Sequence, residues 1–204
     1  MQSFSEIDTT SKRASKAAGF AWGIAEEVGK NMRNLEMFGL PGVKNLNLYL
    51  KKIKENPTEK PKKIEKENKP QAKEFCPIHC GTTFLDNCKV LESLKTIKFK
   101  NVSYPLLFLP FISRASEIVG KKISVQYEEN NFLLNFDKTI FSKNIKNNEV
   151  VSLAKEVSIE FLENSNSFSI QEWKELYKLS EKTFVEETES SKKVGAGAGL
   201  TDND

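Results

Sequence analysis

The sequence predicts an α+β protein in which N-terminal helices and a mainly antiparallel sheet with two further helices are joined by a disordered linker rich in lysine and proline. Three observations support this prediction. Apolar residues recur at helical spacing in the first fifty residues, they alternate with polar residues in several segments after residue 75, and a charged stretch separates the two patterns. No alternation of strand and helix typical of a parallel sheet is present.

Length and composition exclude several protein classes. The 204 residues suffice for one domain of ordinary size with its own core. The longest uninterrupted apolar stretch, Tyr104 to Ile112, is far shorter than the roughly 20 residues of a membrane-spanning helix, and the N-terminus lacks the apolar region of a secretory signal. Three cysteines, an odd number, fit a reducing compartment. We therefore expect a cytoplasmic protein with no membrane partner.

The first predicted element is a helical segment over residues 1–55 that packs on the main body. Ser3 and Glu6 have the spacing of a capping box ahead of a first helix, which Gly19 interrupts. Apolar residues three and four positions apart then line one face of a second helix, which ends near Gly39. A third amphipathic helix follows.

Residues 56–74 form the predicted linker. From Lys51 to Glu74 there are nine lysines and five acidic residues, and Ile64 is the only large aliphatic residue after the third helix. A segment of this composition buries too little apolar surface to fold, so we expect it to be exposed and disordered. Because its excess charge is lysine rather than arginine, we expect no specific nucleic-acid binding.

Residues 75–185 form the predicted α+β body. The apolar segment from Pro105 to Val119 predicts a buried helix that Pro110 kinks, and Ser169 with Glu172 repeats the capping-box spacing ahead of another helix. Asn130 and Asn131 predict the turn of a hairpin. Alternating apolar residues predict strands at residues 97–99, 123–127, 132–136 and 157–161.

The chain closes with a Gly-rich acidic tail, residues 186–204, of net charge −3. Glycine and alanine cannot fill a core, so the tail is either disordered or ordered by docking. A docked tail threads a groove with a slim backbone and brings carboxylates to a basic pocket or a cation. It would contribute five ligand-binding residues: Gly195, Gly197, Gly199, Asp202 and Asp204.

Cysteine and histidine cluster in one short segment. All three cysteines and the only histidine of the chain are Cys76, His79, Cys80 and Cys88. Three thiolates and an imidazole form the ligand set of a structural zinc site, although Cys76 and Cys80 enclose three residues where a zinc knuckle usually has two. The alternatives are ordinary half-buried thiols at a turn and a cysteine nucleophile activated by His79. Apart from this zinc hypothesis, we expect no cofactor.

Glu26 and Glu27 lie in a helix of small residues. A carboxylate that faces a cleft there would act as a general base or bind a cation. The alternative is a solvated helix face, because Glu26 and Lys30 have the spacing and order of a stabilising pair.

Two stretches resemble an uncharacterised bacterial family that is known only as a domain of unknown function. From Ser5 to Gly42 the chain is similar to the family's basic, alanine-rich helix followed by Trp-Gly, Ala-Glu-Glu and Gly-Leu. The end, KTFVEETESSKKVGAGAGLTDND, is similar to the family's C-terminus. The resemblance implies that the two ends form one module with a docked tail, and it favours Trp22, Glu26 and Glu27 as site residues. It implies no activity and no zinc.

The favoured hypothesis is a small-metabolite-binding or enzyme-accessory module whose cleft lies between the helix from Trp22 to Glu27 and the docked tail. Its partner would be a small molecule or a partner enzyme, and the sequence predicts no particular oligomeric state. Two other classes stay open. One is a small-molecule hydrolase, lyase or isomerase with Glu26 or Glu27 as its base, and the other is a protein with a structural zinc site.

Overall fold

The computed structural model describes residues 2–71, 73–135, 137, 139–142 and 150–184. The chain forms two compact units, Met1–Asn164 and a second that begins at Ser165. The first unit contains helices and a six-stranded sheet, which confirms the α+β fold class. The structure divides after Asn164, and the boundaries at residues 55, 74 and 185 stay predictions. Among the described residues, no helix has both the length and the apolar character needed to cross a membrane.

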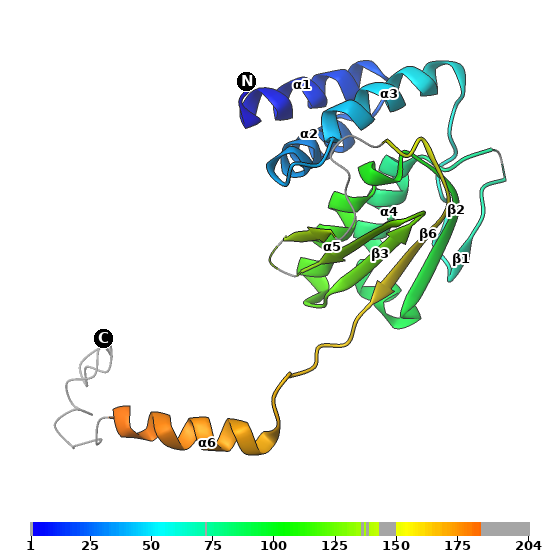
Figure 1. The fold of residues 1–204 in the computed structure, drawn as a ribbon. Helices are drawn as coiled ribbons and strands as arrows, with labels where there is room; N and C mark the ends of the chain where they lie inside the picture. The colour runs from blue at the N-terminus through cyan, green and yellow to red at the C-terminus, as the bar shows by residue number, and fades with distance from the viewer. Residues whose placement is uncertain (1, 72, 136, 138, 143–149, 185–204) are drawn as a thin grey trace, which may run out of the picture. The chain divides into compact units, whose positions relative to one another are not determined.

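Three helices open the first unit and match the three that the sequence predicts (Figure 1). They are α1 (Phe4–Ala17), α2 (Trp22–Met37) and α3 (Gly42–Glu55). At the start of α1 the Ser3 hydroxyl accepts from the Glu6 N–H, and the Glu6 carboxylate accepts from the Ser3 N–H. Gly19 and Gly39 take left-handed backbone, φ 99° and 70°, at the two turns between the helices.

The close packing of α1 on α2 depends on Gly29. A Cβ at this position would lie 2.5 Å from Oδ1 of Asp8 and 2.6 Å from its carbonyl oxygen. Beside this contact, Arg33 of α2 forms an ion pair with Asp8 of α1, with Nη1 and Oδ2 3.4 Å apart. The two helices therefore approach each other at a distance that only glycine permits.

One six-stranded sheet has the order β1-β2-β6-β3-β4-β5. Its neighbouring strands are antiparallel except for β1, which runs parallel to β2. The strands are β1 (Glu67–Asn68), β2 (Thr96–Ser103), β3 (Ile123–Tyr127), β4 (Asn130–Leu134), β5 (Ile140–Ser142) and β6 (Leu153–Phe161).

The hairpin between β3 and β4 turns earlier than predicted. Tyr127 pairs with Asn130, so Glu128 and Glu129 form the turn, and Glu128 has a φ of 47°. We expected Asn130 and Asn131 in the turn. The observed register places Phe132 opposite Val125, which puts both side chains on the buried face of the sheet.

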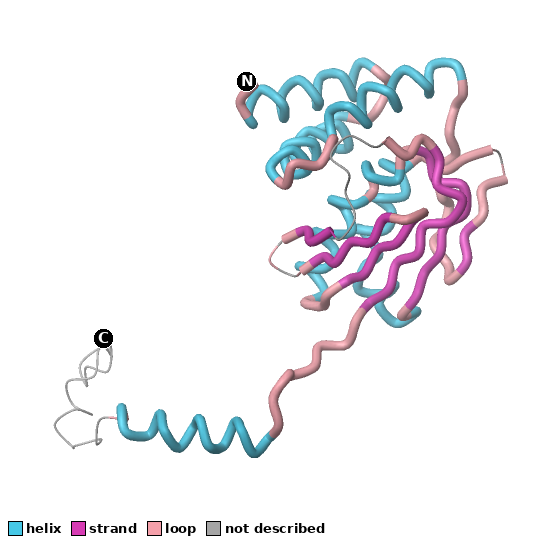
Figure 2. Tube along the Cα trace, viewed as in Figure 1, coloured by secondary structure: helices cyan, strands magenta, loops and turns pink. Residues whose placement is uncertain are grey.

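Two helices, α4 (Pro77–Leu91) and α5 (Leu109–Val119), cover one face of the sheet (Figure 2). The core lies between these layers, where Phe84 of α4 stacks on Phe161 of β6 and Phe108 meets Phe99 of β2 edge to face. The sequence analysis did not predict α4, although its buried residues, among them Phe84, Cys88 and Leu91, recur three or four positions apart on one side of the helix. Pro110 lies in the first turn of α5 and does not kink it.

Within the first unit, residues 56–71 and 73–74 are ordered against the sheet and do not form the disordered linker that their composition predicts. Ile64 and Asn68 are buried, and the Lys98 N–H of β2 donates to the carbonyl of Lys66 at 2.9 Å. Glu59 bonds through its backbone to both Glu74 and Cys76. Main-chain pairing with a sheet edge requires few apolar side chains, which explains why a charged sequence is ordered here.

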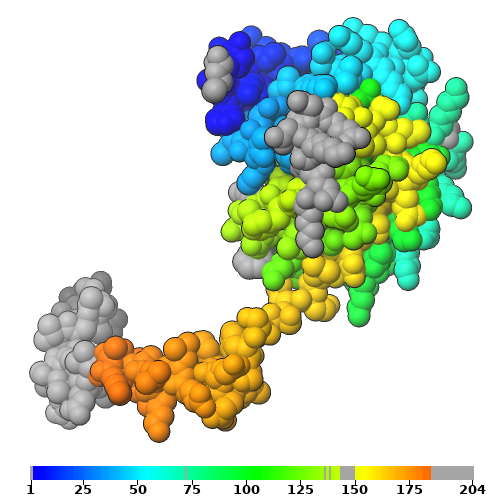
Figure 3. Space-filling view, in the orientation of Figure 1, coloured from blue at the N-terminus to red at the C-terminus, as the bar shows by residue number. Residues whose placement is uncertain are grey.

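The second unit contains α6 (Ile170–Ser180), which begins at the predicted capping box of Ser169 and Glu172. The predicted Gly-rich tail, residues 186–204, lies outside the described residues. In the first unit, the N-terminal helices pack directly on the body, as the space-filling view shows (Figure 3).

Candidate functional site

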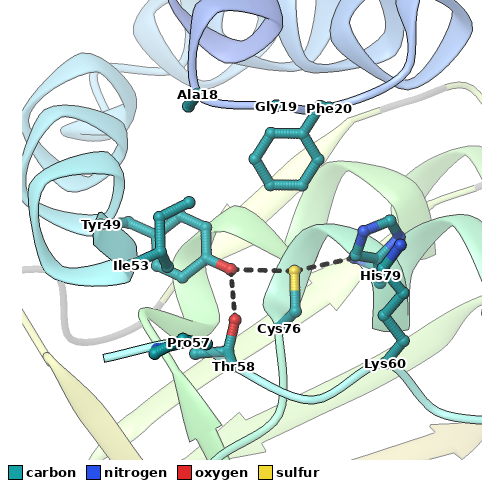
Figure 4. A pocket seen from close by; sticks show the side chains of 10 residues that line it. All are labelled: Ala18, Gly19, Phe20, Tyr49, Ile53, Pro57, Thr58, Lys60, Cys76 and His79. Carbon is teal, nitrogen blue, oxygen red and sulfur yellow. Dashed lines mark hydrogen bonds between the residues drawn. The ribbon is translucent and has the colours of Figure 1, made fainter. Parts of the chain in front are cut away.

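A cavity of about 200 Å³ lies in the first unit, where the turn between α1 and α2 meets α3, the segment 57–60 and the start of α4 (Figure 4). We call it the thiol pocket. The lining residues that carry the argument are Phe20, Tyr49, Thr58, Lys60, Cys76 and His79.

Local backbone geometry places the side chains of the thiol pocket. The left-handed backbone of Gly19 reverses the chain after α1, so that Phe20 turns into the cavity. Cys76 is the N-cap of α4, and its Sγ accepts from the His79 N–H at 3.4 Å, as capping side chains do. The ring of His79 then packs on Phe20 with 5.4 Å between ring centres.

A chain of hydrogen bonds crosses the pocket. The Tyr49 hydroxyl donates to Sγ of Cys76 at 2.9 Å and lies 2.9 Å from Oγ1 of Thr58. Because the only hydroxyl proton of Tyr49 is directed to sulfur, Thr58 must donate to Tyr49. Two separate stretches of backbone, α3 and the segment 57–60, are thereby tied to Cys76, the N-cap of α4.

Burial disfavours the charged forms of Tyr49, Cys76 and His79, while Lys60 brings a positive charge to the lining. Burial raises the pKa of the Cys76 thiol, against the opposing effect of its hydrogen bond from Tyr49. Burial, and next the charge of a Cys76 thiolate, also raise the pKa of Tyr49. Burial and then the positive charge of Lys60 lower the pKa of His79 to about 4. A neutral imidazole has one donor and one acceptor nitrogen to offer a ligand.

A partly buried ion pair supports Tyr49 from behind. Lys52, one turn further along α3, donates to Glu74 at 2.5 Å and to Oγ of Ser103 at 3.2 Å. Its ammonium lies 5.8 Å from the ring centre of Tyr104, which itself packs edge-on against the ring of Tyr49. These contacts hold α3 against the sheet and fix the tyrosine hydroxyl over Cys76.

The structure separates the residues of the predicted zinc site. Cys76, His79 and Cys80 lie at the first turn of α4, whereas Cys88 is eight residues, or about 12 Å of helix rise, beyond Cys80. Within the part of the chain that the structure describes, no group of three or more His, Cys, Asp or Glu residues is placed to hold a metal ion. The helix that the sequence did not predict is the physical reason.

The two predicted carboxylates lie away from the thiol pocket. Glu26 is exposed on α2. Glu27 forms ion pairs with Lys30, at 3.0 Å between Nζ and Oε1, and with Arg114 of α5. A carboxylate held between two cations links the helices and is not a free base.

Trp22 also lies away from the thiol pocket, although its helix begins just after the pocket's turn. Its side chain is 57% exposed, and the ammonium of Lys16 lies 5.4 Å from its ring centre. The five predicted tail residues, Gly195, Gly197, Gly199, Asp202 and Asp204, lie outside the described residues.

Tyr49 and Thr58 are site residues that the sequence analysis did not find. Tyr49 occupies the apolar stripe of α3, where its spacing is that of a core residue, and Thr58 lies in the segment expected to be disordered. Only the folded chain places both beside Cys76.

The comparisons with known proteins bear on the first part of the chain. Residues 2–76 match a family described as a protein of unknown function, DUF3726. This match confirms the resemblance of the N-terminal stretch to an uncharacterised domain family. It covers every lining residue of the thiol pocket named above except His79. A search of curated proteins and a search of solved structures each gave no significant match.

Proposed function

We propose that this protein binds a small organic metabolite in the thiol pocket and acts as a metabolite-binding or enzyme-accessory module. The observation that carries the proposal is a cavity into which uncharged polar groups converge from α3, the segment 57–60 and α4. A ligand site typically combines a cavity with a few converging polar groups. A purely structural contact between these segments would pack closely and leave no cavity.

The lining indicates the chemistry of the ligand. The volume is below the roughly 300 to 1,000 Å³ of sites for drug-sized molecules, so the ligand is smaller. His79 offers a donor or an acceptor, Lys60 attracts an anionic group, and Phe20 and Ile53 provide apolar walls. A compact carboxylic acid with a polar edge fits this set.

The geometry favours binding over thiol catalysis. A cysteine nucleophile reacts as the thiolate, whereas burial raises the pKa of Cys76 and keeps the thiol protonated. The Cys76 sulfur also accepts two hydrogen bonds that fix it in place, one from Tyr49 and one from the backbone of His79. In this proposal Cys76 is a wall of the site.

The proposal keeps the function class that the sequence favours and moves the site. The expected cleft began at Trp22, and the thiol pocket begins at the turn just before it. Docking of the tail against the N-terminal helices remains a prediction, as do a bacterial origin, a cytoplasmic location and a small-molecule or enzyme partner. The three free cysteines support a reducing compartment.

The only histidine of the chain gives a direct test, because its ring protons are the only imidazole signals in a proton NMR spectrum. Free amino acids and small hydroxy acids would be added to the full-length protein while the His79 signals are followed. We expect at least one compound to shift them in saturable fashion.

Two tryptophan variants locate the binding. Ile53→Trp fills the pocket, and Lys54→Trp adds the same bulk on the exposed side of α3. We expect binding to be lost in the first variant and kept in the second. The proposal fails if no compound shifts His79, or if the shift persists in Ile53→Trp.

A further inference from the structure

A second cavity, of about 430 Å³, lies along the C-terminal half of α2 and shares none of its residues with the thiol pocket. We call it the basic pocket. Asp137 lies on one side, and the residues that carry the argument are Lys30, Asn31, Arg33, Met37, Phe38 and Arg114.

Asn31 has an unsatisfied donor in the lining. Its side chain is only 2% exposed, and within the described part of the chain its Nδ2 has no hydrogen-bond partner. A buried amide donor is costly to leave unpaired, and native proteins rarely keep one without a reason. A ligand with an acceptor group in the cavity would satisfy it.

Cations outnumber carboxylates among the side chains that line the pocket around Asn31. Lys30, Arg33 and Arg114 face a lining with one carboxylate, that of Asp137. Lys30 and Arg114 both pair with the carboxylate of Glu27, and Arg33 pairs with Asp8, but neither of these carboxylates lies in the lining. The Asp137 carboxylate already accepts from the backbone and the hydroxyl of Thr139, which lower its pKa.

The rim of the pocket is apolar. Met37 and Phe38, at the end of α2, are 60% and 41% exposed although both are large hydrophobic residues. Exposed apolar side chains next to a cationic pocket are suited to a ligand that has a hydrophobic part and a charged head.

We propose that the basic pocket binds a small organic anion through an oxyanion head and an apolar body. The head accepts a hydrogen bond from Nδ2 of Asn31 and is attracted by Arg33 and Arg114, while the apolar body lies against Met37 and Phe38. Charge-assisted bonds from arginine to a carboxylate or phosphate are among the stronger polar contacts in proteins.

Three related probes test the charge requirement on the full-length protein. Benzoate carries the proposed head and body, phenyl phosphate exchanges the carboxylate for a phosphate, and benzamide is the uncharged counterpart of benzoate. Titrations would be followed by the side-chain amide signals of Asn31 in ¹H–¹⁵N spectra. We expect saturable shifts with benzoate, phenyl phosphate or both, and the stronger of the two identifies the head group. Equal binding of benzamide, or no shift with either anion, would overturn the proposal.

Two further variants test the residues. Asn31→Leu removes the amide donor at similar side-chain volume, and we expect it to weaken anion binding about tenfold or more. Thermal stability should be kept or raised, because the variant no longer buries an unpaired donor. Met37→Asp places a negative charge on the exposed rim without touching the core, and Met37→Gln is its neutral control. We expect the aspartate alone to suppress binding. Unchanged affinity in both Asn31→Leu and Met37→Asp would refute the site, and if Asn31→Leu does not fold, the result of Met37→Asp decides.

Discussion

Replacing Gly29 by alanine should force α1 away from α2. The new Cβ would lie 2.6 Å from the backbone oxygen of Asp8, and ordinary contact begins near 3.4 Å, so the helices must separate by about 0.8 Å. Overpacking of this kind costs about 1 to 3 kcal/mol, while alanine in a helix gains up to about 1 kcal/mol over glycine. The ion pair between Asp8 and Arg33 would be displaced as well.

Gly23 is the matched control, because it lies on the same helix and a Cβ there would meet nothing within 4 Å. Gly23→Ala should therefore be neutral or stabilising. Urea unfolding followed by circular dichroism at 222 nm measures both variants. We expect Gly29→Ala to be about 1 to 3 kcal/mol less stable than Gly23→Ala with an unchanged dependence on urea. Equal midpoints for the two would refute the argument that the interhelical distance requires glycine.

Three other perturbations test the thiol pocket and its support. The folded protein holds the pKa of His79 at about 4, against 6.5 for a free histidine, so the unfolded chain binds the extra proton and stability should fall as the pH decreases from about 6.5 to 4. His79→Gln should make the thermal unfolding temperature depend less on pH between about 4 and 6.5. An unaltered pH dependence would contradict the lowered pKa of His79. Tyr49→Phe deletes the hydroxyl that bonds Cys76 and should cost about 1 kcal/mol in urea unfolding; no loss would mean that this bond contributes nothing. Lys52→Met leaves Glu74 without its cation and should destabilise the protein by more than Lys54→Met, a comparison that thermal unfolding makes directly.

Local signals in the sequence were sufficient for much of the fold. The capping boxes of Ser3 and Ser169 fixed the starts of α1 and α6, because the bonds involved lie within four residues. The alternation of apolar residues identified β3 and β6 for the same reason. Elements stabilised by distant partners were harder to predict. The segment 56–74 is ordered by the edge of β2 and has no local pattern of its own, whereas the buried stripe of α4 is built largely from small residues such as Cys80, Gly81 and Cys88.

The candidate sites divide in the same way. The clustering of cysteine and histidine in the sequence identified Cys76 and His79 as candidate site residues, and both line the thiol pocket. Composition could not show that Tyr49 would reach Cys76 across 27 residues of chain, or that Nδ2 of the buried Asn31 would find no hydrogen-bond partner among the described residues. Both facts depend on how helices pack, and sequence periodicity carries no information about which helices meet.

The short strand β1, which has a lysine on each side, has a consequence for how copies of this protein meet in concentrated solution. An open strand edge is a template for aggregation, because its free N–H and C=O groups can pair with another chain. Here β1 is only two residues long and occupies the outer edge of β2, with exposed lysines on both sides of it. The short strand and its flanking lysines thus act as a gatekeeper that ends the sheet and repels a second sheet.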